Sequence, residues 1–82
     1  MRQGNIIGKR IRLVRELRRL TQRQFARKLR AAGHDVSRDI IARWELSETP
    51  VTDTRILGIA TVLRVSVLDL FPPGGRGRPR TF

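Results

Sequence analysis

The chain has 82 residues, which is enough for one small domain. It contains no cysteine and only one histidine. Disulfides, cysteine nucleophiles and thiolate metal sites are therefore excluded, and we expect neither a metal site nor a cofactor. Eighteen lysine and arginine residues stand against seven acidic residues, for a formal net charge of +11. An imbalance of this size favours a polyanionic partner, with nucleic acid ahead of a membrane surface.

The basic residues are concentrated at the two ends of the chain. Residues 1–30 carry eleven of them and a single acidic residue, Glu16, whereas acidic residues slightly outnumber basic ones over residues 31–71. No apolar stretch approaches the roughly 20 residues that cross a bilayer. Residues 1–8 lack the apolar segment of a secretory signal, so we expect a cytoplasmic protein.

Hydrophobic spacing and capping residues predict the first two helices. Apolar residues three or four apart predict a helix over residues 5–20, with an inner face that ends at Leu17 or Arg18. Thr21, followed three residues later by Gln24, has the pattern of a capping box and predicts the start of a second helix. Residues 31–35 then form a turn, in which we expect His34 to be exposed to solvent.

Three further helices are predicted after this turn. Ser37 is a good N-cap for a third helix that buries Ile41 and Trp44 and carries polar residues on its outer side. Thr52 or Asp53 opens a fourth helix, and the capping-box pattern at residues 66–69 opens a short fifth one. The inward side chains of the fourth helix are expected to be Ile56, Leu57, Ala60 and Leu63. The chain is therefore predicted to be all-α, with a five-helix domain over residues 1–71 and a flexible, disordered basic tail over residues 72–82.

Two short helices, the second bearing outward polar residues, suggest a helix-turn-helix motif at about residues 21–45. The residues that carry this pattern are Ile7-Gly8, Ile11, Leu20-Thr21-Gln22, Phe25-Ala26, Leu29, Val36-Ser37-Arg38, Ile41, Trp44-Glu45 and Leu63-Arg64-Val65-Ser66-Val67. In this order and spacing the chain resembles the lambda-repressor-like regulators of the Cro and xenobiotic-response-element type. The resemblance implies a compact lambda-repressor-like DNA-binding domain of a regulator. No motif in the sequence couples a nucleophile, a base and an orienting group, so an enzyme is not expected.

The resemblance also implies roles for individual residues. The expected base contacts are Gln22, Arg38, Asp39, Ile40 and Arg43, with an arginine forking onto guanine, Asp39 accepting from cytosine and Ile40 touching a thymine methyl group. The expected phosphate contacts are Arg10, Thr21, Arg23, Arg27 and Ser37. Arg15 and Glu45 match a structural ion pair of the family, and Trp44 is expected to pack in the core.

The chain departs from the family pattern in two places. The turn between the two helices of the motif is longer, and Leu46-Ser47-Glu48 stands where the family often has a glycine and basic residues. The carboxylates of Glu48 and Asp53 would repel phosphate, so we expect the loop after the third helix to add little affinity.

The tail segment Arg76-Gly77-Arg78-Pro79 resembles the core of an AT-hook. In such an element glycine lets the backbone enter a narrow minor groove while the arginines lie along its negative floor. A cationic tail that makes non-specific phosphate contacts is the simpler interpretation of the same residues.

These observations lead to one main functional hypothesis and two alternatives. The main hypothesis is a transcriptional repressor that binds double-stranded DNA as a homodimer at a pseudo-palindromic operator, with the third helix in the major groove. The resemblance implies that residues 67–71 form the dimer surface. The alternatives are an antitoxin or anti-repressor module with a protein partner, and a non-specific architectural DNA-binding protein. No membrane contact and no small-molecule ligand are expected.

Overall fold

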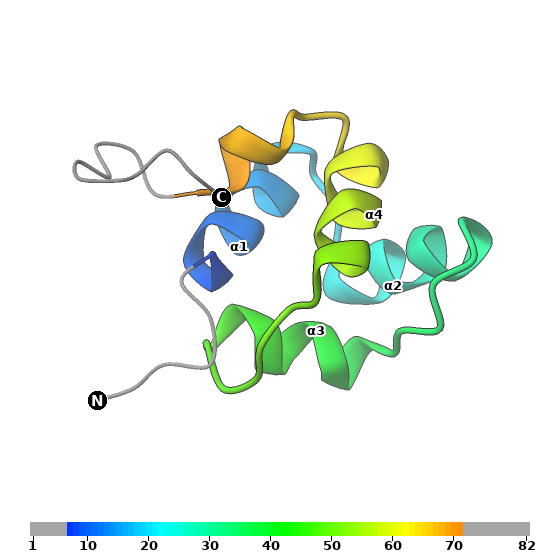
Figure 1. Ribbon diagram of the computed structural model, residues 1–82. Helices are drawn as coiled ribbons and strands as arrows, with labels where there is room; N and C mark the ends of the chain where they lie inside the picture. The colour runs from blue at the N-terminus through cyan, green and yellow to red at the C-terminus, as the bar shows by residue number, and fades with distance from the viewer. Residues whose placement is uncertain (1–6, 72–82) are drawn as a thin grey trace.

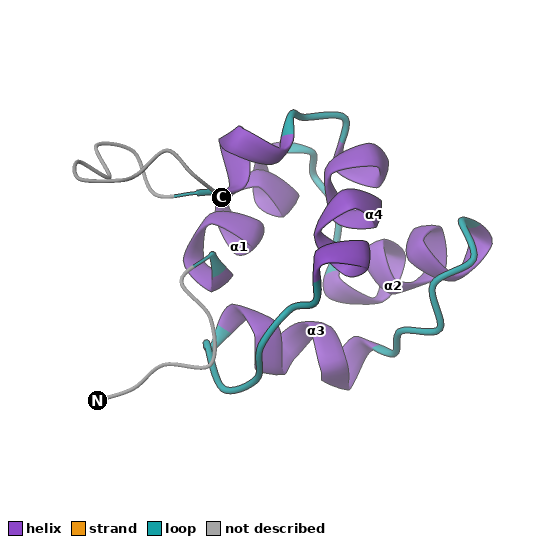
Figure 2. Cartoon of the chain, viewed as in Figure 1, coloured by secondary structure: helices purple, strands orange, loops and turns teal. Residues whose placement is uncertain are grey.

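The computed structural model describes residues 7–71, which form four α-helices followed by one 3-10 helix (Figures 1 and 2). The helices are α1 (Gly8–Leu17), α2 (Gln22–Ala31), α3 (Arg38–Glu45), α4 (Asp53–Leu63) and η1 (Val67–Leu70). The all-α fold is confirmed, since the described residues contain no strand. The expected fifth α-helix is instead a single 3-10 turn. The tail residues Arg76, Gly77, Arg78 and Pro79 lie outside the described residues, as do residues 1–6.

Side-chain caps fix where three of the α-helices begin. The Thr21 hydroxyl accepts a hydrogen bond from the Gln24 backbone amide, and the Gln24 side chain accepts one from the Thr21 amide, which completes the predicted capping box. Ser37 caps α3 through the Ile40 amide, and Thr52 caps α4 through the Arg55 amide. Each cap satisfies a backbone N–H that the first helical turn leaves without a partner.

The core is formed by buried side chains from all four α-helices and from η1. Its largest fully buried side chains are Phe25, Ile11, Leu29, Ile41, Ile59, Leu63, Leu70 and Val36. Trp44 is also buried, at 2% exposure, so its predicted packing role is confirmed. The expectation that Leu57 faces inward is wrong, since Leu57 is 60% exposed. Of the two residues expected to end the inner face of the first helix, Leu17 is 68% exposed, whereas the Arg18 side chain bonds the Leu63 carbonyl. In α4 it is Ile59, two positions after Leu57, that enters the core.

The lengthened turn between α2 and α3 is ordered by contacts from both sides. Gly33 adopts a φ of +97°, a conformation that side chains disfavour. Arg30 donates a hydrogen bond from Nη1 to the Val36 carbonyl (3.0 Å), and the Val36 side chain is fully buried. His34 is half-buried rather than exposed, because its ring lies against Gly58 of α4, where a Cβ atom would be only 2.2 Å from Nε2.

Within residues 7–71 no helix combines the length and the apolar character that crossing a membrane requires.

Candidate nucleic-acid interface

Helices α2 and α3, joined by the ordered turn, form the helix-turn-helix unit (Figure 1). α3 packs against both α1 and α2 and buries Ile41 and Trp44 on its inner side. Its first three residues and Arg43 remain exposed. The second helix of the unit therefore presents a polar surface while its apolar side is anchored in the core.

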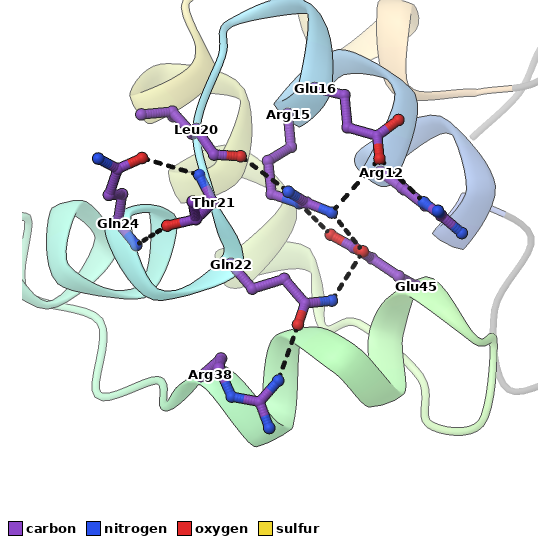
Figure 3. A network of polar contacts seen from close by, with 9 residues as sticks. All are labelled: Arg12, Arg15, Glu16, Leu20, Thr21, Gln22, Gln24, Arg38 and Glu45. Carbon is purple, nitrogen blue, oxygen red and sulfur yellow. Dashed lines mark hydrogen bonds and ion pairs between the residues drawn. The ribbon is translucent and has the colours of Figure 1, made fainter.

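A buried ion pair connects α1 to the end of α3. Arg15 of α1 donates two hydrogen bonds to Glu45, from Nε to Oε2 at 2.6 Å and from Nη2 to Oε1 at 3.0 Å (Figure 3). Both residues are 8% exposed. Arg15 also donates from Nη1 to the Leu20 carbonyl at 2.7 Å. The hydrogen bonds with Glu45, followed by its charge, raise the pKa of Arg15 above its ordinary value and outweigh the opposing effect of burial.

Gln22, the first residue of α2, extends this ion pair towards the surface. Its amide nitrogen donates to Oε1 of Glu45 (3.0 Å), and its amide oxygen accepts from Nη1 of Arg38 (2.9 Å), as Figure 3 shows. A carboxylate only accepts and a guanidinium only donates, so the two partners determine which way the amide points. Gln22 thus links the buried pair to the exposed start of α3.

Arg38, the first residue of α3, is held by two acceptors on different helices. Besides the Gln22 oxygen, Oδ1 of Asp39 accepts a hydrogen bond from Nη2 at 2.9 Å. The side chains of Arg38 and Asp39 are 49% and 76% exposed, so both are accessible to a partner molecule. A guanidinium has five N–H donors, and these two contacts leave the remaining three available.

The other residues expected to contact DNA are distributed around this point. Ile40 is 36% exposed, and Arg43 lies one turn further along α3 and is exposed. Thr21 and Ser37 stand at the N-termini of α2 and α3, where backbone N–H groups and the helix dipole favour an anion. Arg23 and Arg27 lie exposed on α2. The structure therefore gathers most of the expected contacts around the start of α2 and α3.

Arg10 is placed differently. Its Nε donates to the Asp69 carbonyl of η1 at 3.1 Å, which ties α1 to the end of the domain. Arg18 acts in a similar way at the end of α4, with Nε bonded to the Leu63 carbonyl (2.7 Å) and Nη2 to the Arg64 carbonyl (3.0 Å). Including Arg15 and Arg30, four arginines of the basic N-terminal segment hold backbone carbonyls.

Sequence reasoning missed this internal use of arginine, because it assigned most of the N-terminal charge to the partner. The local signal was weak. In the sequence, only a helix end with unsatisfied carbonyls indicates that a side-chain donor is needed. The sequence does not indicate which arginine supplies it, since Arg18 bonds carbonyls that lie 45 and 46 positions further along the chain.

Residues 7–71 contain no group of three or more histidine, aspartate or glutamate side chains that could hold a metal ion. What the arrangement offers instead is an exposed helix N-terminus that bears hydrogen-bond donors and acceptors, next to a second helix N-terminus. These features define a helix-turn-helix domain of the DNA-binding class.

Comparison with known families agrees with this assignment. A family model described as Helix-turn-helix matches residues 11–70, and the chain belongs to this family, that of the Cro-type and xenobiotic-response-element-type regulators. Membership of this family indicates that the chain is a DNA-binding transcriptional regulator. Searches of curated proteins and of solved structures found no match to this chain.

Proposed function

We propose that the protein is a sequence-specific transcriptional repressor that places α3 in the major groove of its operator. The observation that carries the proposal is the exposed polar start of α3, held by a network that runs from the buried Arg15–Glu45 pair through Gln22 to Arg38. A helix that reads bases must be fixed in orientation, because a bidentate contact tolerates little displacement. The network supplies such fixation at the end of α3 that bears Arg38.

The division of the contacts follows from side-chain chemistry. Arg38 and Arg43 are suited to guanine O6 and N7, Ile40 to a thymine methyl group, and Gln22 to an adenine edge or a phosphate. Arg23 and Arg27, with the N-termini of α2 and α3 at Thr21 and Ser37, are suited to phosphates.

The proposed operator is a pseudo-palindrome bound by two copies of the chain. A dimer with twofold symmetry matches half-sites about one helical turn of DNA apart. Residues 67–71 are proposed as the dimer surface. This proposal is supported by Leu68, a large apolar side chain that is 69% exposed on η1 and would be covered by a partner copy.

Selection of bound sequences from a random duplex pool at about 0.15 M salt tests this function, because non-specific binding is weakened at that ionic strength. We expect an enriched motif with twofold symmetry, and we expect Arg38→Ala and Arg43→Ala each to relax the preference at one position per half-site. Lys9→Ala, which removes one charge at an exposed position of α1, is the matched control and should leave the motif unchanged.

Other outcomes would point to the other functions. Measurable binding without any enrichment would indicate an architectural DNA-binding protein. An enriched single half-site, together with a monomer in sedimentation at all concentrations and a Leu68→Ala variant that binds normally, would refute the proposed dimer. A toxin or anti-repressor that co-purifies with the chain and masks α3 would indicate the antitoxin-type function.

A further inference from the structure

The start of α3 holds an arginine and an aspartate next to each other in the chain, and both were expected to read bases separately. Arg38 and Asp39 occupy the first two positions of α3. Consecutive residues on a helix do not normally face each other. The 2.9 Å contact between Nη2 and Oδ1 therefore requires the Arg38 side chain to bend back towards its neighbour.

The bend is supported from the opposite helix. Nη1 of Arg38 bonds the Gln22 amide oxygen, while the nitrogen of the same amide bonds the buried Glu45. One acceptor on α2 and one on α3 thus hold the two terminal nitrogens of the guanidinium. Since a free arginine side chain has several rotatable bonds, two such contacts remove much of the freedom that it would lose on binding DNA.

We propose that Asp39 is a positioning residue that sets Arg38 for a single guanine, and that it is not itself a reader of cytosine. The guanidinium retains Nε–H and one N–H on each terminal nitrogen, and a bidentate contact with guanine O6 and N7 needs two donors. The inference rests on the proposed function, since it concerns how the same interface selects its sequence.

The negative charge of Asp39 has a second effect, which is to lower the affinity for DNA. A carboxylate at the start of α3 repels the phosphates of any duplex and neutralises Arg38 as a general phosphate ligand. Asp39 therefore lowers affinity for unrelated DNA while it raises the discrimination that Arg38 achieves. A residue that only stabilised the helix would leave this discrimination unchanged.

A double-mutant cycle on discrimination tests the proposal. The base pair that Arg38→Ala relaxes in the selection experiment is first identified. The affinities of wild type, Arg38→Ala, Asp39→Ala and the double variant are then measured for the selected duplex and for one altered at that pair. Both side chains are about half or more exposed, so the variants are expected to fold, and thermal melts verify this.

Wild type and the three variants are expected to discriminate between the two duplexes to different extents. Wild type should discriminate by about 5- to 150-fold, the range of one bidentate contact. Asp39→Ala should reduce this discrimination about fivefold, as expected for the net contribution of one typical hydrogen bond at an exposed site, and should raise affinity for unrelated DNA. In the Arg38→Ala background the same change should alter discrimination by less than about twofold.

Asp35→Ala is the matched control. It removes one negative charge from an exposed position of the turn before α3, and it should change the affinities for both duplexes by the same factor.

Two results would overturn the inference and leave the proposed function intact. One is an equal loss of discrimination from Asp39→Ala with and without Arg38, which would mean that Asp39 reads its base independently. The other is an enriched wild-type motif in which Arg38→Ala or Asp39→Ala relaxes no base pair. A wild-type pool without any enriched motif would refute the proposed function, and this inference with it.

Discussion

Arg15→Ala is expected to destabilise the domain more than Glu45→Ala, although each variant removes the same ion pair. Losing one partner of a buried pair costs about 3–5 kcal/mol, because the other charge is left without compensation. Arg15→Ala also removes the donor to the Leu20 carbonyl. After Glu45→Ala, Arg15 keeps that bond and has Glu16 at 4.0 Å. Glu45→Ala in turn removes the acceptor of the Gln22 amide, so each variant loses one hydrogen bond besides the ion pair. The difference that remains is the attraction between Arg15 and Glu16, which is 52% exposed, and it should be less than about 1 kcal/mol.

These costs are large for a chain of this size, whose whole stability is expected to be about 4–12 kcal/mol. Urea unfolding followed by far-ultraviolet circular dichroism measures them without using Trp44, which is adjacent to Glu45 in the sequence. Arg12→Ala is the control, since its pair with Glu16 is 62% and 52% exposed and should contribute less than about 0.5 kcal/mol.

The double variant of Arg15 and Glu45 provides a further check. Replacing both residues with apolar ones, as in Arg15→Met with Glu45→Leu, should recover much of the stability lost in the single variants, because no charge is then left buried alone. Single-variant losses below about 1 kcal/mol, or a larger loss for Glu45→Ala than for Arg15→Ala, would refute this reasoning.

Three other substitutions test backbone and packing features. Ser47→Gly should stabilise the domain by about 0.5–1 kcal/mol in a thermal melt, because Ser47 has a φ of +61°; a lower melting temperature would contradict this. Gly58→Ala should destabilise the wild type by forcing the His34 ring aside, yet stabilise a His34→Ala background by up to about 1 kcal/mol through helix propensity. Stabilisation in both backgrounds would show that the ring yields freely, and destabilisation in both would show that the ring is not the cause. Arg18→Lys should lower the free energy of unfolding by about 1 kcal/mol in chemical denaturation, because an ammonium group would take the place of a guanidinium that bonds two carbonyls. Arg19→Lys, at an exposed position, should be neutral.

The helix starts could be predicted because their signals are local. Thr21 with Gln24, and Ser66 with Asp69, each lie within one turn, and both capping boxes are present in the structure. The length of the last element was not predictable in the same way. The cap specifies where a turn begins, but the following residues and their packing decide whether it continues as an α-helix.

The inner face of α4 was harder to assign, since apolar residues occur on several sides of the helix. In the segment Ile56-Leu57-Gly58-Ile59-Ala60, periodicity alone does not determine the phase. The choice of Ile59 over Leu57 is made by the neighbouring helices. The half-buried position of His34 also depends on tertiary packing. Its ring is covered only because the lengthened turn lies against α4 at Gly58, which has no side chain in the way.

The candidate interface was predictable at the level of its elements and less so at the level of its contacts. The polar outer side of α3 follows from the positions of Ile41 and Trp44 on the opposite side. The link from Gln22 to Arg38 joins two helices across the lengthened turn, and sequence spacing does not specify it. Family resemblance supplied roles for both residues, but not the bond between them.

The arginines that hold carbonyls have a practical consequence for anyone who would engineer this protein. Lowering the positive charge is a common way to reduce adhesion to nucleic acid during purification. Neutralising Arg10, Arg15, Arg18 or Arg30 would release helix ends or the turn along with the charge. The exposed Lys9, Arg12 and Arg19 are safer positions for such redesign. Of the four basic residues of α1, two, Arg10 and Arg15, cannot be changed independently of the fold.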